Sequence, residues 1–182
     1  MQLHIEGNKS KKVALFGVFL AFILVMGLVE RMIPLDGIAP GMKLGIANLA
    51  VVISLYIFSA RDTLVLVILK CMMTAMLSGS VMALLYSVPA SFASLAAMYV
   101  LIRVKIASPV GVSVVGAAFH NTTQIIVARY ILGTWGILIY LPFLLAIGTV
   151  SGVLIGMLAK SMLPKLWAYI DNGKSCHEQV SK

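Results

Sequence analysis

The residues best suited to chemistry are polar side chains that lie inside long apolar runs. Lys70 lies eight residues into one run, so in a helix it would be roughly 12 Å deep, near the middle of a bilayer. Another run carries His120, Asn121 and Gln124, and His120 shares a helix face with Gln124 because they are four residues apart. Ionisable groups inside a membrane are costly and usually mark function. The alternatives are snorkelling for Lys70 and interhelical hydrogen bonds for the other three.

The other polar candidates lie nearer the ends of apolar runs. Tyr86 and Ser87 share one run, and Tyr86 has packing as its alternative role. Glu30, Lys43 and Asn48 belong to segment 30–48, which is rich in proline and glycine. All these positions fall in the same half of the expected bilayer, so we predict a pocket open to that side with segment 30–48 as its lid. The predicted substrate-binding residues are Glu30, Lys43, Asn48, Lys70, Tyr86, Ser87, His120, Asn121 and Gln124.

This set of residues favours binding over catalysis. Lysine and amide side chains suit a small organic molecule that carries an anionic group. The three aspartates, Asp36, Asp62 and Asp171, are too widely separated to hold magnesium on a diphosphate. The sequence contains no Walker A, GxSxG or HExxH motif. We therefore expect no enzyme, no metal and no cofactor.

The composition is that of a membrane protein. Of the 182 residues, 61% are hydrophobic and 11% are charged, against roughly 25% charged in soluble domains. The net charge of +8 does not indicate nucleic-acid binding, because no basic patch alternates with aromatic residues. Cys71 and Cys176 form no metal-binding or CxxC spacing and are expected to be free thiols.

The apolar runs predict an all-α integral membrane protein with six transmembrane helices. Each run is close to the ~20 residues that cross a hydrocarbon core. The first run has no cleavage site after it, so it is predicted to be a membrane span and not a signal peptide. The expected spans are 13–33, 44–60, 62–78, 81–102, 108–128 and 137–159.

Lysine and arginine placement predicts the orientation. With the N-terminus inside, the inner segments hold ten of the fourteen basic residues and the outer segments hold three, namely Arg31, Lys43 and Arg129. Both termini are therefore expected in the cytoplasm, with segment 30–48 outside. The resulting divisions are an N-terminal segment 1–12, a membrane domain 13–160 and a cytoplasmic tail 161–182. A short surface helix is expected from Leu163.

Small residues and prolines indicate how the helices pack. Gly148, Gly152 and Gly156 form two overlapping GxxxG motifs, which either pack within the bundle or dock a second membrane subunit. Pro89 and Pro142 lie within expected spans and should kink them. Tyr130 and Trp135 fit an aromatic belt at the membrane surface.

Four motifs resemble a known family. They are E-R-M-I-P from Glu30, A-P-G-M-K-L-G-I-A-N-L from Ala39, L-Y-S from Leu85 and G-A-A-F-H-N-T-T-Q from Gly116. Together they resemble the bacterial membrane family called heptaprenyl diphosphate synthase component I, also named the Gx transporter family, over roughly 13–160. The matching positions are Glu30, Pro34, Pro40, Lys43, Gly45, Asn48, Lys70, Tyr86, Ser87, His120, Asn121 and Gln124.

The resemblance implies more than the spacing does. The family is similar to the S components of energy-coupling factor transporters, six-helix proteins that bind a vitamin or precursor. It implies partnership with a membrane coupling subunit and two ATPases, in a bacterial cytoplasmic membrane. Two departures affect ligand shape: Lys70 stands where arginine is expected, and Ser87–Ser91 replaces a glycine-rich segment.

Two functional hypotheses follow. The first is an S-component-like subunit for ATP-driven uptake of an anionic vitamin, cofactor, isoprenoid or quinone precursor. The second is a non-catalytic membrane component of a heptaprenyl diphosphate synthase in isoprenoid or quinone metabolism. A self-sufficient small transporter is a weaker third possibility.

Overall fold

The residues that the structure describes fold into six α-helices and one 3-10 helix. The structure is a computed structural model, and it describes residues 9–32, 45–78 and 81–180. All regular structure in these ranges is helical, as the sequence predicts. The elements are α1 (Lys9–Met32), α2 (Asn48–Ile57), α3 (Ala60–Ser78), α4 (Val81–Val104), α5 (Pro109–Leu132), η2 (Trp135–Tyr140) and α6 (Leu141–Val180).

Four of these helices are long and apolar enough to cross a membrane. They are α1, α4, α5 and α6, judged on the described residues alone. The second predicted span, 44–60, yields the much shorter α2, whose ten residues are too few to cross a hydrocarbon core. α3 has nearly the expected length, yet its charged first turn and Lys70 make it more polar. The four long helices support a multi-pass membrane protein.

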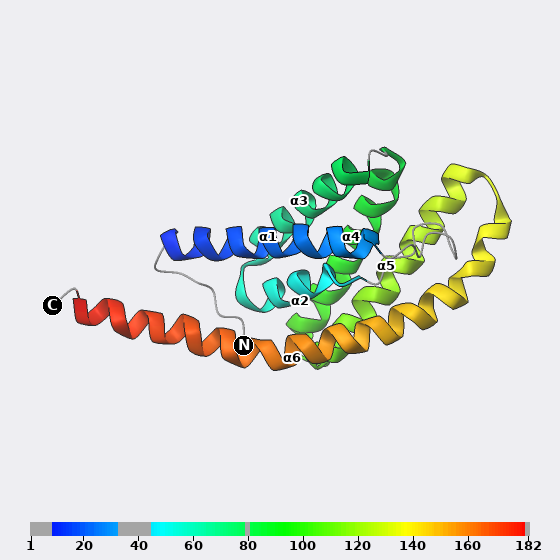
Figure 1. Cartoon of the computed structure of the whole chain (residues 1–182). Coiled ribbons are helices and arrows are strands. Elements are labelled where there is room, and N and C mark those ends of the chain that lie inside the picture. Colours follow the sequence, from blue (N-terminus) through cyan, green and yellow to red (C-terminus); the bar gives the residue numbers. More distant parts are fainter. Residues whose placement is uncertain (1–8, 33–44, 79–80, 181–182) are drawn as a thin grey trace.

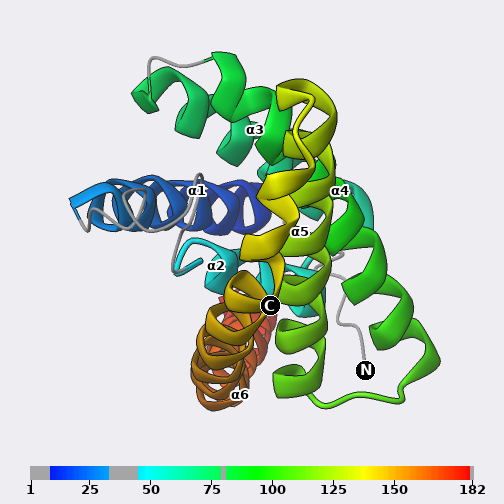
Figure 2. The ribbon, with the colours of Figure 1, turned by 90° about the vertical axis from the view of Figure 1, so that its right-hand side faces the viewer.

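α2 lies at the centre of the molecule. It contacts α1, α3, α5 and α6, and eight of its ten residues are buried. This explains its composition, because a helix that is apolar on every side must be covered on every side. Figure 2 shows α1 and α6 lying on either side of α2. The larger hydrophobic cluster of the protein surrounds this helix, with Leu55 and Ile57 among its most deeply buried members.

α6 differs from its prediction. The tail from Leu163 was expected to form a separate surface helix, but α6 continues without a break to Val180. At 1.5 Å per residue its 40 residues span about 60 Å, and its curved course is visible along the lower edge of Figure 1. Leu163 is 5% exposed, and Trp167 and Ile170 pack against the main core, so the extension packs on the bundle as far as Ile170. Pro164 is accommodated inside the helix.

The two predicted proline kinks have different outcomes. Pro89 lies inside α4, where the sequence placed it. Pro142 is the second residue of α6, directly after η2. Proline is tolerated in the first turn of a helix because its missing N–H has no partner there. Pro142 therefore lies where η2 passes into α6, within the apolar stretch Trp135–Ile170 as predicted.

The glycines of α6 pack against α5. A Cβ added at Gly152 would lie 2.9 Å from Val114 Cα, and one at Gly156 would lie 2.5 Å from Val110 Cα. As the residue number of the glycine increases along α6, the residue number of its neighbour on α5 decreases, so the two helices are antiparallel. They touch through backbone atoms. Of the two alternatives for these motifs, packing within the chain is confirmed.

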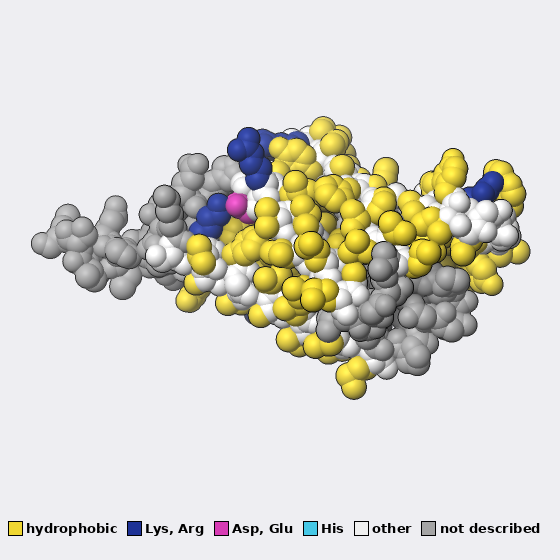
Figure 3. Space-filling model, turned by 90° about the horizontal axis from the view of Figure 1, so that it is seen from above, with side chains coloured by type: hydrophobic (Ala, Val, Ile, Leu, Met, Phe, Trp, Pro, Cys, Tyr) yellow, Lys and Arg dark blue, Asp and Glu magenta, His cyan; other side chains and the backbone are white. Residues whose placement is uncertain are grey.

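Apolar side chains cover most of the surface. Figure 3 shows them over the middle of the molecule, with lysine and arginine side chains towards its two ends. Tyr130, in the last turn of α5, is 79% exposed, and Trp135, at the start of η2, is 72% exposed, which is compatible with an aromatic belt. An apolar middle between charged ends is the surface expected of a protein that lies in a bilayer.

Candidate ligand-binding site

Lys70 and Asn48 form the centre of the candidate site. The ammonium group of Lys70, on α3, donates a hydrogen bond to Asn48 Oδ1 in the first turn of α2. Both side chains are half-buried. The amide oxygen of Asn48 helps to hold the ammonium group in place. A charge held in this way can attract an anionic group.

A glycine turn places Asn48 where Lys70 can reach it. Gly45 has a φ of +75°, a conformation that a side chain would strain, and its carbonyl accepts a hydrogen bond of 2.8 Å from the Asn48 backbone N–H. A Cβ on Gly45 would also lie 3.4 Å from Asn48 Nδ2. The turn thus begins α2 and fixes the direction of the Asn48 side chain.

Glu30 adds a third helix to the cluster. Its Oε1 atom, near the end of α1, accepts a hydrogen bond of 3.3 Å from the backbone N–H of Ala47. Ala47 directly precedes Asn48, so α1, α2 and α3 meet at one place. The structure therefore brings together three predicted site residues, Glu30, Asn48 and Lys70, which come from separate apolar runs. Lys43 and segment 33–44 lie outside the described residues.

Ser87 lies beside the same part of α3. The Sγ atom of Cys71, the residue after Lys70, is 3.8 Å from both the Oγ and the carbonyl oxygen of Ser87. It also donates to Ser91 Oγ at 3.4 Å. Sequence reasoning singled out neither Cys71 nor Ser91 for the site. The four-residue spacing of Ser87 and Ser91, which puts both on one face of α4, was the available signal.

Tyr86 points to a different neighbourhood. It is half-buried and packs against a small hydrophobic cluster formed by α5, η2 and α6, which includes Ile125 and Leu144. Its neighbour Ser87 contacts α3. Adjacent residues of α4 therefore face the two sides of the bundle, and α4 connects them. The packing role was the stated alternative for Tyr86, and its ligand-binding role stays a prediction.

The predicted site residues of α5 are His120, Asn121 and Gln124, and Asn121 faces α6. Asn121 Nδ2 donates a hydrogen bond of 2.8 Å to the Leu144 carbonyl of α6, and the Asn121 amide also fills the space above Gly148. His120 and Gln124 are half-buried on the same helix. Asn121 thus has a packing role of the kind that interhelical hydrogen bonds provide. Its role in binding, like those of His120 and Gln124, stays a prediction.

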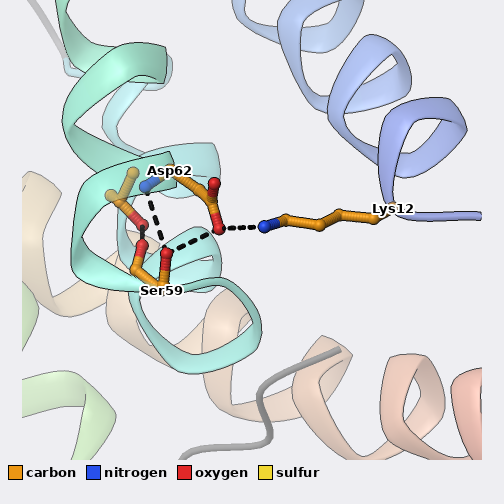
Figure 4. Close-up of polar contacts among 4 residues, drawn as sticks. Lys12, Ser59 and Asp62 are labelled. Carbon is orange, nitrogen blue, oxygen red and sulfur yellow. Dashed lines mark hydrogen bonds and ion pairs between the residues drawn. The ribbon is translucent and has the colours of Figure 1, made fainter. Parts of the chain in front are cut away.

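A separate polar cluster lies at the opposite end of α1. Lys12 Nζ is 2.7 Å from Asp62 Oδ2, which also accepts a hydrogen bond of 2.6 Å from Ser59 Oγ (Figure 4). Ser59 in turn accepts the Asp62 backbone N–H at 3.3 Å, a side-chain cap at the start of α3. The buried Thr63 hydroxyl donates to the Ser59 carbonyl. This cluster attaches the start of α1 to the α2–α3 turn.

The site can hold a ligand through charge and directional hydrogen bonds. Lys70 supplies a cation, and the Asn48 amide and the Ser87 hydroxyl supply donors and acceptors. Among the described residues, no three histidine, cysteine, aspartate or glutamate side chains lie close enough together to hold a metal ion. Lysine, amide and hydroxyl groups are side chains of the kind that can bind an organic anion.

Comparison with known proteins gives one match. A family model described as heptaprenyl diphosphate synthase component I matches residues 19–162, which include every residue predicted for the site. No curated protein and no solved structure matches the chain.

Proposed function

The chain belongs to the heptaprenyl diphosphate synthase component I family, and we propose that it is the ligand-binding membrane subunit of an uptake system. The observation that carries this proposal is the contact of Lys70 with Asn48, next to the Ala47–Glu30 hydrogen bond. A half-buried lysine is energetically costly in an apolar bundle, and ionisable residues at such positions usually mark function. Its ligand would be a small organic anion related to a vitamin, cofactor, isoprenoid or quinone precursor.

In this proposal all six helices lie in the bacterial cytoplasmic membrane with both termini in the cytoplasm. The excess of basic residues on the inner segments supports this orientation. In this arrangement α2 crosses inside the bundle, where α1, α3, α5 and α6 cover it, so its ten residues need not match the thickness of the lipid. Segment 30–48 would then face outward and close over the site.

Transport against a gradient needs an energy source that this chain does not supply. Its sequence has no nucleotide-binding motif. The proposed partners are therefore a membrane coupling subunit and two cytoplasmic ATPases, as the resemblance to S components implies. In this role the chain is a binding protein and not an enzyme.

The test is mass spectrometry of small molecules retained by the purified protein. Lys70→Met removes the charge at similar length and should lower ligand retention roughly tenfold or more, since hydrogen bonds to charged groups are among the strongest. Lys70→Arg is the matched control, because it keeps the charge and should keep most of the retention. Equal retention by the protein and Lys70→Met would remove Lys70 from the site. Purification without any coupling subunit or ATPase would contradict the uptake system.

A second function has one observation in its favour, the description of the family itself. A component of a prenyl diphosphate synthase that lacks catalytic residues would anchor or feed a soluble catalytic subunit. This function predicts that synthase activity in membranes depends on the chain. An assay of prenyl diphosphate formation with and without the chain separates the two proposals, because an uptake subunit leaves synthase activity unchanged.

A further inference from the structure

The turn between α4 and α5 carries two exposed cations next to exposed apolar side chains. Arg103 is in the last turn of α4, and Lys105 follows the helix. Val104 and Ile106 are 56% and 76% exposed at the same place. A soluble acidic partner would match the charges and leave these apolar side chains without a partner. A phospholipid matches both, since it carries a phosphate next to acyl chains.

Arg103 is oriented by an aromatic neighbour. Its Nε atom donates a hydrogen bond of 2.8 Å to the Tyr99 hydroxyl, and its guanidinium lies 5.2 Å from the centre of the Tyr99 ring. Guanidinium has five N–H donors, so this contact leaves others available to a phosphate. An arginine fixed in this way loses less side-chain freedom when it binds an anion.

Lys105 has an unusual backbone conformation. Its φ is +57°, and among the described residues it is the one non-glycine with a positive φ. Glycine is the residue that adopts this conformation without strain. A lysine here costs stability that a glycine would not, so packing does not explain the side chain. It places a second cation two residues from Arg103.

Other cations converge on the same end of the molecule. The ion pair of Lys12 with Asp62 places the start of α1 beside the start of α3. The antiparallel packing of α5 and α6 brings exposed Lys160 and Lys165 to the end where α5 begins. Asp62, which lies at this end at the start of α3, is paired with Lys12. The local field therefore attracts anions.

We propose that Arg103 and Lys105 form a phosphate-binding site for an anionic phospholipid in the leaflet at this end of the bundle. The site is independent of the ligand-binding function, since it lies at the far end of α3 and α4 from the Lys70 cluster. The lipid phosphate would accept hydrogen bonds from Arg103 and Lys105, and its acyl chains would cover Val104 and Ile106.

The test uses native mass spectrometry of the full chain after incubation with mixed vesicles of phosphatidylglycerol and phosphatidylcholine. The protein should retain phosphatidylglycerol in preference. The double variant Arg103→Gln and Lys105→Gly should retain about 25-fold less phosphatidylglycerol, because each removed charge should lower retention about fivefold. The Lys105→Gly change suits the backbone, so the single variant should unfold at the same temperature as the protein or higher and still bind less lipid.

Arg129→Gln is the matched control. Arg129 lies near the other end of α5 with its guanidinium 3.7 Å from the centre of the Trp135 ring, so it has the same chemistry at the opposite end of the molecule. Its loss should leave phosphatidylglycerol retention unchanged. Soluble glycerol phosphate, added in excess, should not displace the lipid.

Three results would overturn the proposal. They are equal retention of both lipids by the protein, unchanged retention by the double variant, and an equal loss in Arg129→Gln. Displacement by glycerol phosphate would assign the turn to a free phosphate compound. Capture of a soluble acidic protein by chains in phosphatidylcholine alone, lost in the double variant, would assign it to a protein partner.

Discussion

The α5–α6 pair and the α1–α2–α3 side of the bundle are held together by different kinds of contact. α5 and α6 touch through backbone atoms, because Gly152 and Gly156 remove the side chains between them. On the other side, Glu30, Asn48 and Lys70 connect three helices through polar side chains. Close backbone contact leaves no room for a ligand. Polar contacts between helices can be exchanged for contacts with one.

α1 is attached at few places. Its first half packs Phe19 against Phe58, with ring centres 5.4 Å apart, and Lys12 pairs with Asp62. Beyond Ile23 its apolar side chains are half-buried or exposed, and a Cβ added at Gly27 would meet nothing within 4 Å. Glu30 is the polar contact of this outer part with α2. We infer that α5 and α6 form the scaffold and that adjustment on ligand binding occurs around α1.

The largest effect is expected from a side chain inserted between α5 and α6. Gly156→Val places a Cβ 2.5 Å from Val110 Cα, so the two backbones must separate. Overpacking of this kind costs about 1–3 kcal/mol, and the upper end applies because the obstacle is backbone. Thermal unfolding in detergent, followed by circular dichroism, should show a transition several degrees lower.

Gly17→Val is the matched control for that change. Gly17 lies on the exposed side of α1 and has no neighbour within 4 Å of an added Cβ, so the same substitution should leave the transition unchanged. Equal destabilisation by Gly156→Val and Gly17→Val would show that the α5–α6 pair is packed no more closely than the α1–α2–α3 side.

The next largest effect compares two asparagines. Asn48→Ala removes the oxygen that holds the Lys70 ammonium group. Ligand retention should fall about tenfold, because the positive charge is no longer held in position. Asn121→Ala removes a 2.8 Å hydrogen bond to α6 and should lower the free energy of unfolding by about 1 kcal/mol, with a smaller loss of retention. Retention measured by mass spectrometry and thermal unfolding of the same preparations provide both readings. A larger loss of retention in Asn121→Ala would move the site towards α5.

The sequence predicted helices well and their ends less well. Long apolar runs identify membrane helices because the length needed to cross a bilayer is fixed. The length of α2 was overestimated, since the Gly45 turn and the neighbours that cover α2 are not visible in its composition. The continuation of α6 was missed because polar residues after Lys160 resembled a boundary. Leu163 and Trp167 pack against a core that only the tertiary structure creates.

The candidate site was predictable in part, because the regular rise of a helix gives the depth of each residue. Depth along a helix follows from counting residues, and it placed Glu30, Asn48 and Lys70 in one half of the bilayer before any contact was known. Counting cannot give the direction of a side chain around a bundle. Tyr86 and Asn121 fall in the same predicted half, yet they pack towards α6.

A smaller effect is expected at the C-terminal end of α1. Glu30→Gln keeps an acceptor for the Ala47 N–H and removes the negative charge from the start of α2, where it is worth about 0.3–1 kcal/mol. Amide hydrogen exchange in the last turns of α1 should increase, with little change in the unfolding temperature. Glu30→Leu, which also removes the acceptor, should increase exchange further. No difference between the two variants would mean that the 3.3 Å hydrogen bond does not hold this end of α1.

The smallest effect is expected at the N-terminal end of α1. Lys12 and Asp62 are partly exposed, at 38% and 24%, so water and salt screen their attraction, and Lys12→Gln should cost no more than about 1 kcal/mol. Phe19 keeps the helix on Phe58, so the fold should persist while amide exchange rises in the first turns of α1. The rise should shrink in high salt, which already weakens the pair in the unaltered protein. Lys165→Gln, an equal loss of charge on α6, should leave amide exchange in α1 unchanged. If exchange in α1 rises as much in Lys165→Gln as in Lys12→Gln, the cause is the net charge and not the Lys12–Asp62 ion pair.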